Sequence, residues 1–281
     1  MIRSLLYVPG SSPKFIAKAH ERGADAVIVD LEDAVAPSEK TAAREALSQT
    51  VPSVGQKGAT TFVRVNNSDE RLLPDAEAAC RAGADGLYIP KVSTPDLLAA
   101  IVRHIAPIEA ELGRKPMVFV PLIEDPGSVF DARPIAAGPR VLALSAGAED
   151  LATAMGAQPT PEVLKLPKQL IHMAAKAAGV LSFGLLRTVA DYSDVEGLRL
   201  AAREARDFGF DGASCIHPSV VAVLNEAFAP SEAEIAWARK VVAANAEAAA
   251  AGNGAFTLEG RFIDAPIAAR AEAVIALSER R

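Results

Sequence analysis

The strongest constraint on the fold of this chain is an alternation between short apolar runs and longer stretches with helical periodicity. Each apolar run is rich in Val, Ile, Leu and Phe, and the segment after it has the spacing of an amphipathic helix. Repeated βα units indicate a parallel sheet, because each crossover helix returns the chain to the same edge. We predict eight strands, at about residues 4–8, 25–30, 60–65, 86–90, 117–122, 141–146, 180–186 and 212–216.

Three of the expected helix-to-strand joints repeat one pattern, a glycine followed two residues later by an aspartate. The glycines are Gly23, Gly83 and Gly209. Glycine readily adopts the left-handed conformation that ends a helix before the chain turns back into a sheet. A doubly wound open sheet would carry the same signals. The count of eight favours a closed (β/α)8 barrel, the TIM barrel, which takes about 250 residues.

The pattern changes near residue 230. Ser231 and Glu234 form the sequence of a capping box at the start of an Ala-rich helix. Gly252-Asn253-Gly254 should end this helix, residues 256–262 should form a short hairpin or loop, and a last helix should begin near Pro266. We therefore expect a catalytic barrel domain of residues 1–230 and a C-terminal helical extension of residues 231–281, which could act as a lid.

Composition and charge exclude several functions. A hydrophobic content of 50% lets 281 residues bury a large core. The net charge of −6 argues against nucleic-acid binding, which needs a clustered basic surface. The apolar N-terminal run is too short for a signal peptide, and we find no run of about 18 apolar residues that could span a membrane. Cys80 and Cys215 have no framework spacing, which fits a reducing compartment. We expect a cytoplasmic protein.

Polar residues stand at the end of most predicted strands, and in a barrel these ends share the catalytic face. Carboxylates that converge from several strands repel one another unless a cation lies among them. Mg²⁺ prefers such oxygen ligands. The alternative is that individual acids cap helices or pair with basic residues at the rim. The set comprises Asp30, Glu32, Asp33, Arg64, Asn66, Asn67, Lys91, Glu124, Asp125, Glu149, Asp150, Arg187 and His217.

The segment after the first strand suggests an anion site. It has a turn, an N-cap serine and a proline in the first helical turn, and a helix N-terminus attracts phosphate. Lys14, Lys18 and Arg22 recur every four residues, which would place three positive charges on one helix face. These side chains either form a solvated face or contact a phosphorylated cofactor tail.

Covalent catalysis has weaker support. His217 is the one histidine at a predicted strand end, so no Ser-His-Asp arrangement is indicated. Lys91 could form a Schiff base, but the acids expected around it would raise the pKa of its ammonium group rather than lower it.

At these residues the sequence resembles the citrate lyase β-subunit-like branch of the HpcH/HpaI aldolase/citrate lyase superfamily, which includes malyl-CoA, citramalyl-CoA and citryl-CoA lyases. The resemblance covers nearly the whole chain. It rests on the ordered blocks RSLLYVPGSSPKF, GADAVIVDLEDAVAPSEKTAAR, GADGLYIPKV, PLIEDPGSV, LALSAGAEDLATAMG, GFDGASCIHPSVVAVLNEAFAPSEAEIAWAR and LEGRFIDAPIAARA.

The resemblance implies a role for each of several residues. Arg64 would hold the thioester oxygen, and Asp264 would be the acid that relatives deliver onto a neighbouring subunit's active site. Asp264 also precedes Pro266 as a good helix N-cap, and it could serve both roles. Glu124 and Asp150 would bind Mg²⁺, while Asp30 to Asp33 would order metal-bound water. The coenzyme A side and the pocket would be contacted by Tyr7, Lys14, Lys18, Ile216 and His217.

The resemblance predicts a Mg²⁺-dependent carbon–carbon lyase. It would cleave or form a β-hydroxyacyl-CoA thioester by Claisen-type chemistry, with an acyl-CoA and a 2-keto acid as the other reactants. We expect a homotrimer or homohexamer with small-molecule partners only. The alternatives are a malyl-CoA-type thioesterase, a metal-dependent pyruvate aldolase without CoA, and a non-catalytic subunit. The segments Glu124-Asp125-Pro126 and SFGLLRTVADYSD depart from many relatives, which leaves the substrate open.

Overall fold

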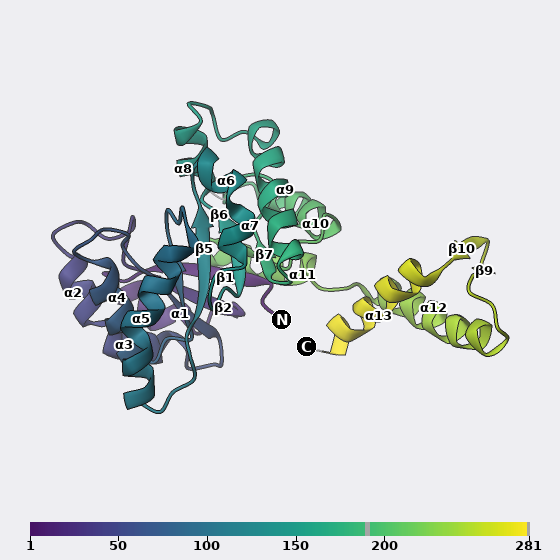
Figure 1. Cartoon of the computed structure of the whole chain (residues 1–281), viewed down its shortest axis with the longest axis horizontal. Coiled ribbons are helices and arrows are strands. Elements are labelled where there is room, and N and C mark those ends of the chain that lie inside the picture. The colour runs from purple at the N-terminus through teal and green to yellow at the C-terminus, as the bar shows by residue number, and fades with distance from the viewer. Residues whose placement is uncertain (189–191, 280–281) are drawn as a thin grey trace. The chain divides into compact units, whose positions relative to one another are not determined.

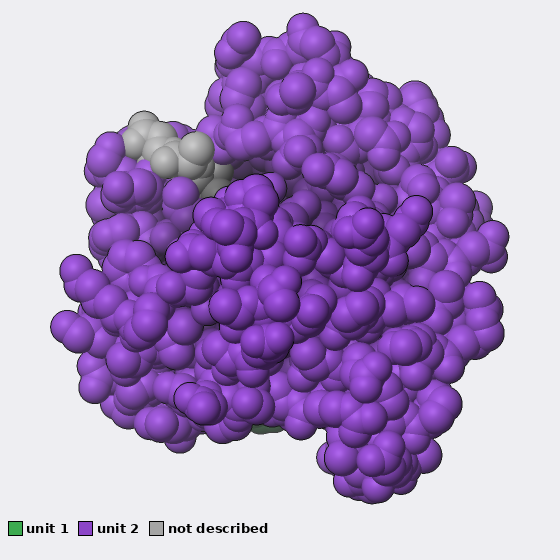
Figure 2. All heavy atoms as spheres, turned by 90° about the vertical axis from the view of Figure 1, so that its left-hand side faces the viewer, with its two compact units in different colours: residues 1, 226–281 green, residues 2–225 purple. Residues whose placement is uncertain are grey.

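The computed structural model describes residues 1–188 and 192–279 (Figure 1). It contains two compact units. One comprises residues 2–225, which face the viewer in Figure 2, and the other comprises residue 1 with residues 226–281. Within the described ranges, every helix is too short or too polar to cross a membrane.

Eight parallel strands form the centre of the larger unit (Figure 1). They follow chain order from β1 to β7, and β8 pairs with β1. A bridge between Phe183 and Gly212 joins the β7 end to the β8 end. The predicted (β/α)8 barrel is therefore confirmed, and sequential order with closure excludes a doubly wound sheet. The strands are β1 (Ser4–Pro9), β2 (Ala26–Asp30), β3 (Thr60–Arg64), β4 (Gly86–Ile89), β5 (Val118–Ile123), β6 (Ala143–Ala146), β7 (Leu181–Phe183) and β8 (Ala213–Cys215).

Helices follow every strand and surround the barrel (Figure 1). The joints at Gly23, Gly83 and Gly209 have φ values of 71°, 86° and 96°, which confirms the predicted left-handed glycines. The helices are α1 (Pro13–Ala19), α2 (Lys40–Glu45), α3 (Leu47–Val54), α4 (Leu72–Arg81), α5 (Pro95–Glu111), α6 (Pro126–Phe130), α7 (Ala132–Ala136), α8 (Ala148–Ala154), α9 (Pro161–Ala177), α10 (Val195–Asp207), the 3₁₀ helix η1 (Pro218–Val220) and α11 (Val221–Ala227).

Helix α1 corrects one prediction. It ends at Ala19, so Lys14 and Lys18 lie on the helix whereas Arg22 lies in the turn after it. The four-residue repeat of basic side chains therefore does not form a three-charge helix face, because the chain leaves the helix early to reach the left-handed Gly23.

Apolar side chains fill the interior of the barrel. Leu5, Ile28, Phe62 and Tyr88 are fully buried in one cluster with residues from the later strands. The Phe62 and Tyr88 rings meet edge to face, with their centroids 5.4 Å apart. Because this core is packed, a functional cavity has room at the ends of the strands and none along the barrel axis.

The C-terminal unit is a helical hairpin with a small antiparallel sheet: α12 (Glu232–Ala250), β9 (Phe256–Leu258), β10 (Arg261–Ile263) and α13 (Ala265–Glu279). The capping box of Ser231 and Glu234 is confirmed. Helices α12 and α13 pack side by side (Figure 1) around Val241 and Ile263. Oδ1 of Asp264 accepts a hydrogen bond of 3.3 Å from the Ile267 N–H, which confirms its role as an N-cap.

Candidate active site

A cavity of about 450 Å³ lies at the carboxyl ends of the barrel strands. Five residues to which the resemblance gives a binding or catalytic role line it together: Tyr7, Arg64, Glu124, Asp150 and Ile216. Tyr7 and Arg64 belong to β1 and β3, Glu124 and Ile216 directly follow β5 and β8, and Asp150 lies in the first turn of α8 after β6. The barrel thus brings together side chains that are far apart in the sequence. Four further residues predicted for the catalytic face also line it: Asp30, Asp33, Glu149 and Arg187. Ser145, Gly147, Lys168 and Thr188 are additional lining residues.

Arg64 is held in a fixed orientation by Asp30. The two residues end neighbouring strands and lie opposite each other in the register of β2 and β3. Nε and Nη2 of Arg64 donate hydrogen bonds of 2.7 and 2.6 Å to the two Asp30 oxygens. Burial alone would lower the pKa of Arg64, but hydrogen bonding to Asp30 and the nearby negative charges, among them Asp30 and Glu32, together keep this pKa above its usual value. The cavity therefore contains a permanent, oriented positive charge.

The face of the Arg64 guanidinium lies against Tyr7, 5.0 Å from the centre of its ring. On the other side, Nη1 of Arg64 lies 2.9 Å from Oε2 of Glu32, and 3.3 Å from Oδ2 of Asp33. Three carboxylates thus surround one guanidinium. Burial raises the pKa of Glu32 to about 7 despite the proximity of Arg64.

Glu124 is held from two sides. The backbone N–H of Lys91 donates a hydrogen bond of 2.8 Å to its Oε2, and Lys91 adopts the left-handed conformation, with φ of 52°, that allows this contact. On the other side, Gly147 leaves room for the carboxylate, because a Cβ atom there would lie 2.3 Å from Oε1. Burial, and next the charges of Asp150 and Glu32, raise the pKa of Glu124 to about 7.

The Lys91 ammonium group lies among these acids, 3.8 Å from Oδ1 of Asp150 and 4.0 Å from Oε1 of Glu32. Burial alone would lower its pKa. The charges of Glu32, Asp150 and Glu124 outweigh burial, so the pKa is raised as predicted. A raised pKa keeps the amine protonated, which argues against Schiff-base chemistry at Lys91.

The donor set suits a hard divalent cation. Glu124 and Asp150 both line the cavity and provide carboxylate oxygens, the ligands that such a cation prefers. Among the described residues, no three His, Cys, Asp or Glu side chains form a metal-binding group. Mg²⁺ fits such a site, because it commonly takes one or two carboxylates and keeps several waters.

Lys168 was missed by the sequence analysis. It lies in α9, 5% exposed, and Nζ donates hydrogen bonds of 2.8 Å to the carbonyl oxygens of Leu185 and Arg187. Burial lowers its pKa to about 7. A sequence signal existed, since Lys168 falls on the buried stripe of α9 with Leu164 and Ile171, where an apolar residue is expected.

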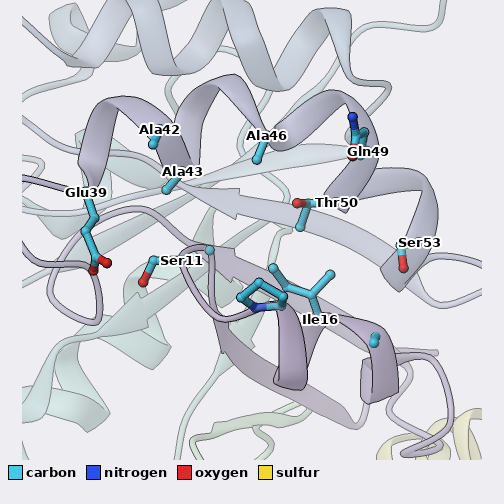
Figure 3. Close-up of a pocket in the computed structure, with 12 residues that line it drawn as sticks. Ser11, Ile16, Glu39, Ala42, Ala43, Ala46, Gln49, Thr50 and Ser53 are labelled. Carbon is cyan, nitrogen blue, oxygen red and sulfur yellow. The ribbon is translucent and has the colours of Figure 1, made fainter.

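The remaining predicted residues lie outside the cavity wall. Lys14 and Lys18 are exposed on α1. Their chain neighbours Pro13 and Ala17 line a second groove of about 440 Å³ between α1 and helices α2 and α3 (Figure 3). His217 is exposed, and its Nδ1 accepts the Ser219 N–H at the start of η1. Asp264 belongs to the C-terminal unit.

Comparisons with known proteins agree with this geometry. Residues 3–218 match the family model HpcH/HpaI aldolase/citrate lyase. A (3S)-malyl-CoA thioesterase of Cereibacter sphaeroides is 37% identical over 93% of this chain and 89% of its own length. A citrate lyase subunit beta of Leuconostoc mesenteroides is 33% identical over 98% of this chain and 93% of its own.

Among solved structures, protein CitE from Mycobacterium tuberculosis, in complex with magnesium, acetoacetate and coenzyme A, has a TM-score of 0.81 and 31% identity over 99% of this chain and 98% of its own. The barrel, the charged cavity and these relatives define an enzyme of the CoA-ester lyase class. The chain belongs to the HpcH/HpaI aldolase/citrate lyase family, in its citrate lyase β-subunit-like branch.

Proposed function

We propose that this chain is a Mg²⁺-dependent lyase that cleaves, or in reverse forms, a β-hydroxyacyl-CoA thioester between its α and β carbons. The products of cleavage are an acyl-CoA and a 2-keto acid. The observation that carries the proposal is the pairing of two environments in one cavity: the acids Glu124 and Asp150 on one side, and the oriented guanidinium of Arg64 on the other. Similar solved structures that hold magnesium and coenzyme A support it.

Mg²⁺, when bound, would act as a Lewis acid toward the hydroxyl and carboxylate that become the keto acid. Glu124 and Asp150 would hold it. Arg64 would face the thioester oxygen, where negative charge develops as the carbon–carbon bond breaks. Asp30 fixes the direction of the guanidinium, which leaves an N–H of Nη2 to donate to that oxygen.

The CoA moiety would bind on the β1 side of the cavity. We assign Tyr7, Ile216 and His217 to the acyl and pantetheine end. Lys14 and Lys18 would bind the phosphates, as exposed cations on α1 in a chain of net charge −6.

Asp264 would exchange a proton with the α carbon of the acyl group. We propose that it serves the active site of a neighbouring subunit in a homotrimer or homohexamer, with the C-terminal unit as a lid. Asp264→Asn and Arg64→Ala would each be inactive, and mixing them under subunit exchange should restore activity in sites that contain both intact groups. Failure to recover activity despite proven exchange would restrict Asp264 to helix capping.

Malyl-, citramalyl- and citryl-CoA with Mg²⁺ provide the direct test of the reaction. Cleavage should release acetyl-CoA and a keto acid in equal amounts, with loss of turnover in a chelator and in Asp150→Ala. Full activity of that variant in chelator-treated buffer would contradict the metal assignment.

A thioesterase is the second candidate, because one relative of 37% identity carries that name. Hydrolysis would release coenzyme A with its thiol unblocked and the intact hydroxy acid. A thiol-specific reagent therefore separates the two reactions in the same assay, since acetyl-CoA does not react with it.

A further inference from the structure

The cavity contains a cation that the proposed reaction does not use. We infer that Arg187 binds a second carboxylate on the hydroxyl-bearing carbon of the substrate and thereby determines which thioester the enzyme prefers. This inference rests on the proposed function and refines it, since it selects thioesters whose keto-acid half is a dicarboxylate.

Arg187 has the largest set of uncommitted donors among the cavity-lining cations of the described chain. Arg64 is already surrounded by the carboxylates of Asp30, Glu32 and Asp33. Lys168 donates to two backbone carbonyls. The guanidinium of Arg187 offers five N–H groups, and its hydrogen bond is one of 3.2 Å from Nη1 to Asp194.

The backbone that carries Arg187 is fixed at the metal end of the cavity. Lys168 binds its carbonyl oxygen, and the hydroxyl of Thr188 donates a hydrogen bond to Glu149, which directly precedes Asp150. Strand β7 pairs with β6, and the first turn of α8 after β6 carries Glu149 and Asp150. The contact between Thr188 and Glu149 therefore places Arg187 beside the proposed metal ligand Asp150 and the expected keto-acid half.

Asp194 orients the Arg187 guanidinium but uses one of its five hydrogen-bond donors. Asp194 is held as the N-cap of α10 by a hydrogen bond of 2.9 Å from the Gly197 N–H, and its side chain is 47% exposed. An exposed ion pair contributes little binding energy, so a substrate carboxylate can add to the same guanidinium. Gly197 makes room for the pair, because a Cβ atom there would lie 1.9 Å from Oδ2 of Asp194 and 2.8 Å from Nη1 of Arg187.

The three thioesters of the test panel differ in this respect alone. Their hydroxyl-bearing carbon carries hydrogen in malyl-CoA, methyl in citramalyl-CoA and carboxymethyl in citryl-CoA. A guanidinium at this place favours the third, because the donors of Arg187 that Asp194 does not use gain nothing from a hydrogen or a methyl group.

The test compares wild type with Arg187→Met, Arg187→Lys and the control Arg81→Met, which removes a half-exposed arginine of α4. The ratio of kcat/KM for citryl-CoA over malyl-CoA should fall at least about tenfold in Arg187→Met and less in Arg187→Lys. It should keep its wild-type value in Arg81→Met. An equal loss for both thioesters, or a wild type that cleaves malyl-CoA and not citryl-CoA, would overturn the inference.

Binding of the keto acids gives a second readout. With Mg²⁺ present, calorimetry should show that Arg187→Met weakens oxaloacetate binding relative to pyruvate binding, while circular dichroism checks that the variant is folded. This measurement tests Arg187 even when no thioester is cleaved, an outcome that contradicts the proposed function alone. Unchanged relative affinity for the two keto acids would remove Arg187 from the substrate site.

Discussion

Gly147 and Glu124 fit together so closely that a Cβ atom on the glycine would lie 2.3 Å from Oε1 of the glutamate and 2.6 Å from its Cγ. Oε2 of the same carboxylate is bound by the Lys91 N–H at 2.8 Å. A larger side chain at residue 147 would therefore displace the Glu124 carboxylate. Glu124 would then lose either its hydrogen bond to Lys91 or its orientation toward the cavity.

Gly147→Ala should weaken Mg²⁺ binding at least about tenfold, because it displaces one of the two proposed ligands. Isothermal titration with Mg²⁺ measures the effect, and the melting temperature of the metal-free variant shows whether the barrel is intact. Gly254→Ala is the matched control, since a Cβ there meets nothing within 4 Å. Wild-type affinity in Gly147→Ala would show that Glu124 does not bind the metal in this conformation.

The acids of the cavity predict a pH dependence of metal binding. Burial raises the pKa of both Glu124 and Glu32 to about 7, whereas an unfolded chain has them near 4.5. Between these values the folded protein binds more protons than the unfolded chain, so these two groups make the metal-free protein less stable as the pH rises. Mg²⁺ needs the carboxylate form, so its affinity should increase through about pH 7 and level off above it.

Thermal unfolding with and without Mg²⁺ measures this directly. The stabilisation by Mg²⁺ should be small at about pH 6 and larger at about pH 8. Glu124→Gln should lose most of the stabilisation at both pH values, because a neutral amide is a weaker Mg²⁺ ligand than the carboxylate. An equal shift in melting temperature at both pH values in the wild type would contradict the raised pKa.

Lys168→Met should destabilise the barrel by about 1–3 kcal/mol, because it leaves the carbonyl oxygens of Leu185 and Arg187 without their donor. Urea unfolding measures the loss. Lys176→Met is the control on the same helix, where an ion pair with Asp211 is 40% and 28% exposed and should contribute less than about 1 kcal/mol. Equal losses in the two variants would mean that Lys168 is not a structural anchor.

Replacing Lys14 and Lys18 together with Ala should raise KM for a CoA thioester more than it lowers kcat, because a cation that binds a remote phosphate contributes uniform binding. The effect should shrink with added salt, which screens exposed charges. The N-acetylcysteamine thioester of the same acid has no phosphate, so its KM should respond less. The same rise in KM for both thioesters would place the two lysines elsewhere in the reaction.

Much of the barrel could be predicted from the sequence. Each strand is covered by helices and therefore consists of a short run of apolar residues, which can be recognised locally. The same logic located Arg64 and Glu124 at strand ends, and Asp150 in the segment after β6, where the structure has the first turn of α8. The prediction for Arg22 was wrong. It followed from the four-residue spacing of Lys14, Lys18 and Arg22 in the sequence, but helix α1 ends at Ala19, before Arg22.

The sequence by itself determined the eight βα units and the charged residue types at their ends, since both follow from periodicity along the chain. Only the tertiary structure decided how these charges pair. The register of β2 against β3 places Asp30 beside Arg64, and the inward position of Lys168 on α9 commits its amine to the β7 loop. The guanidinium of Arg187 pairs with Asp194 through one of its N–H groups, and among the described residues its other donors pair with no acid from the neighbouring strands. Pairing of this kind depends on distances between segments far apart in the chain, which no local pattern encodes.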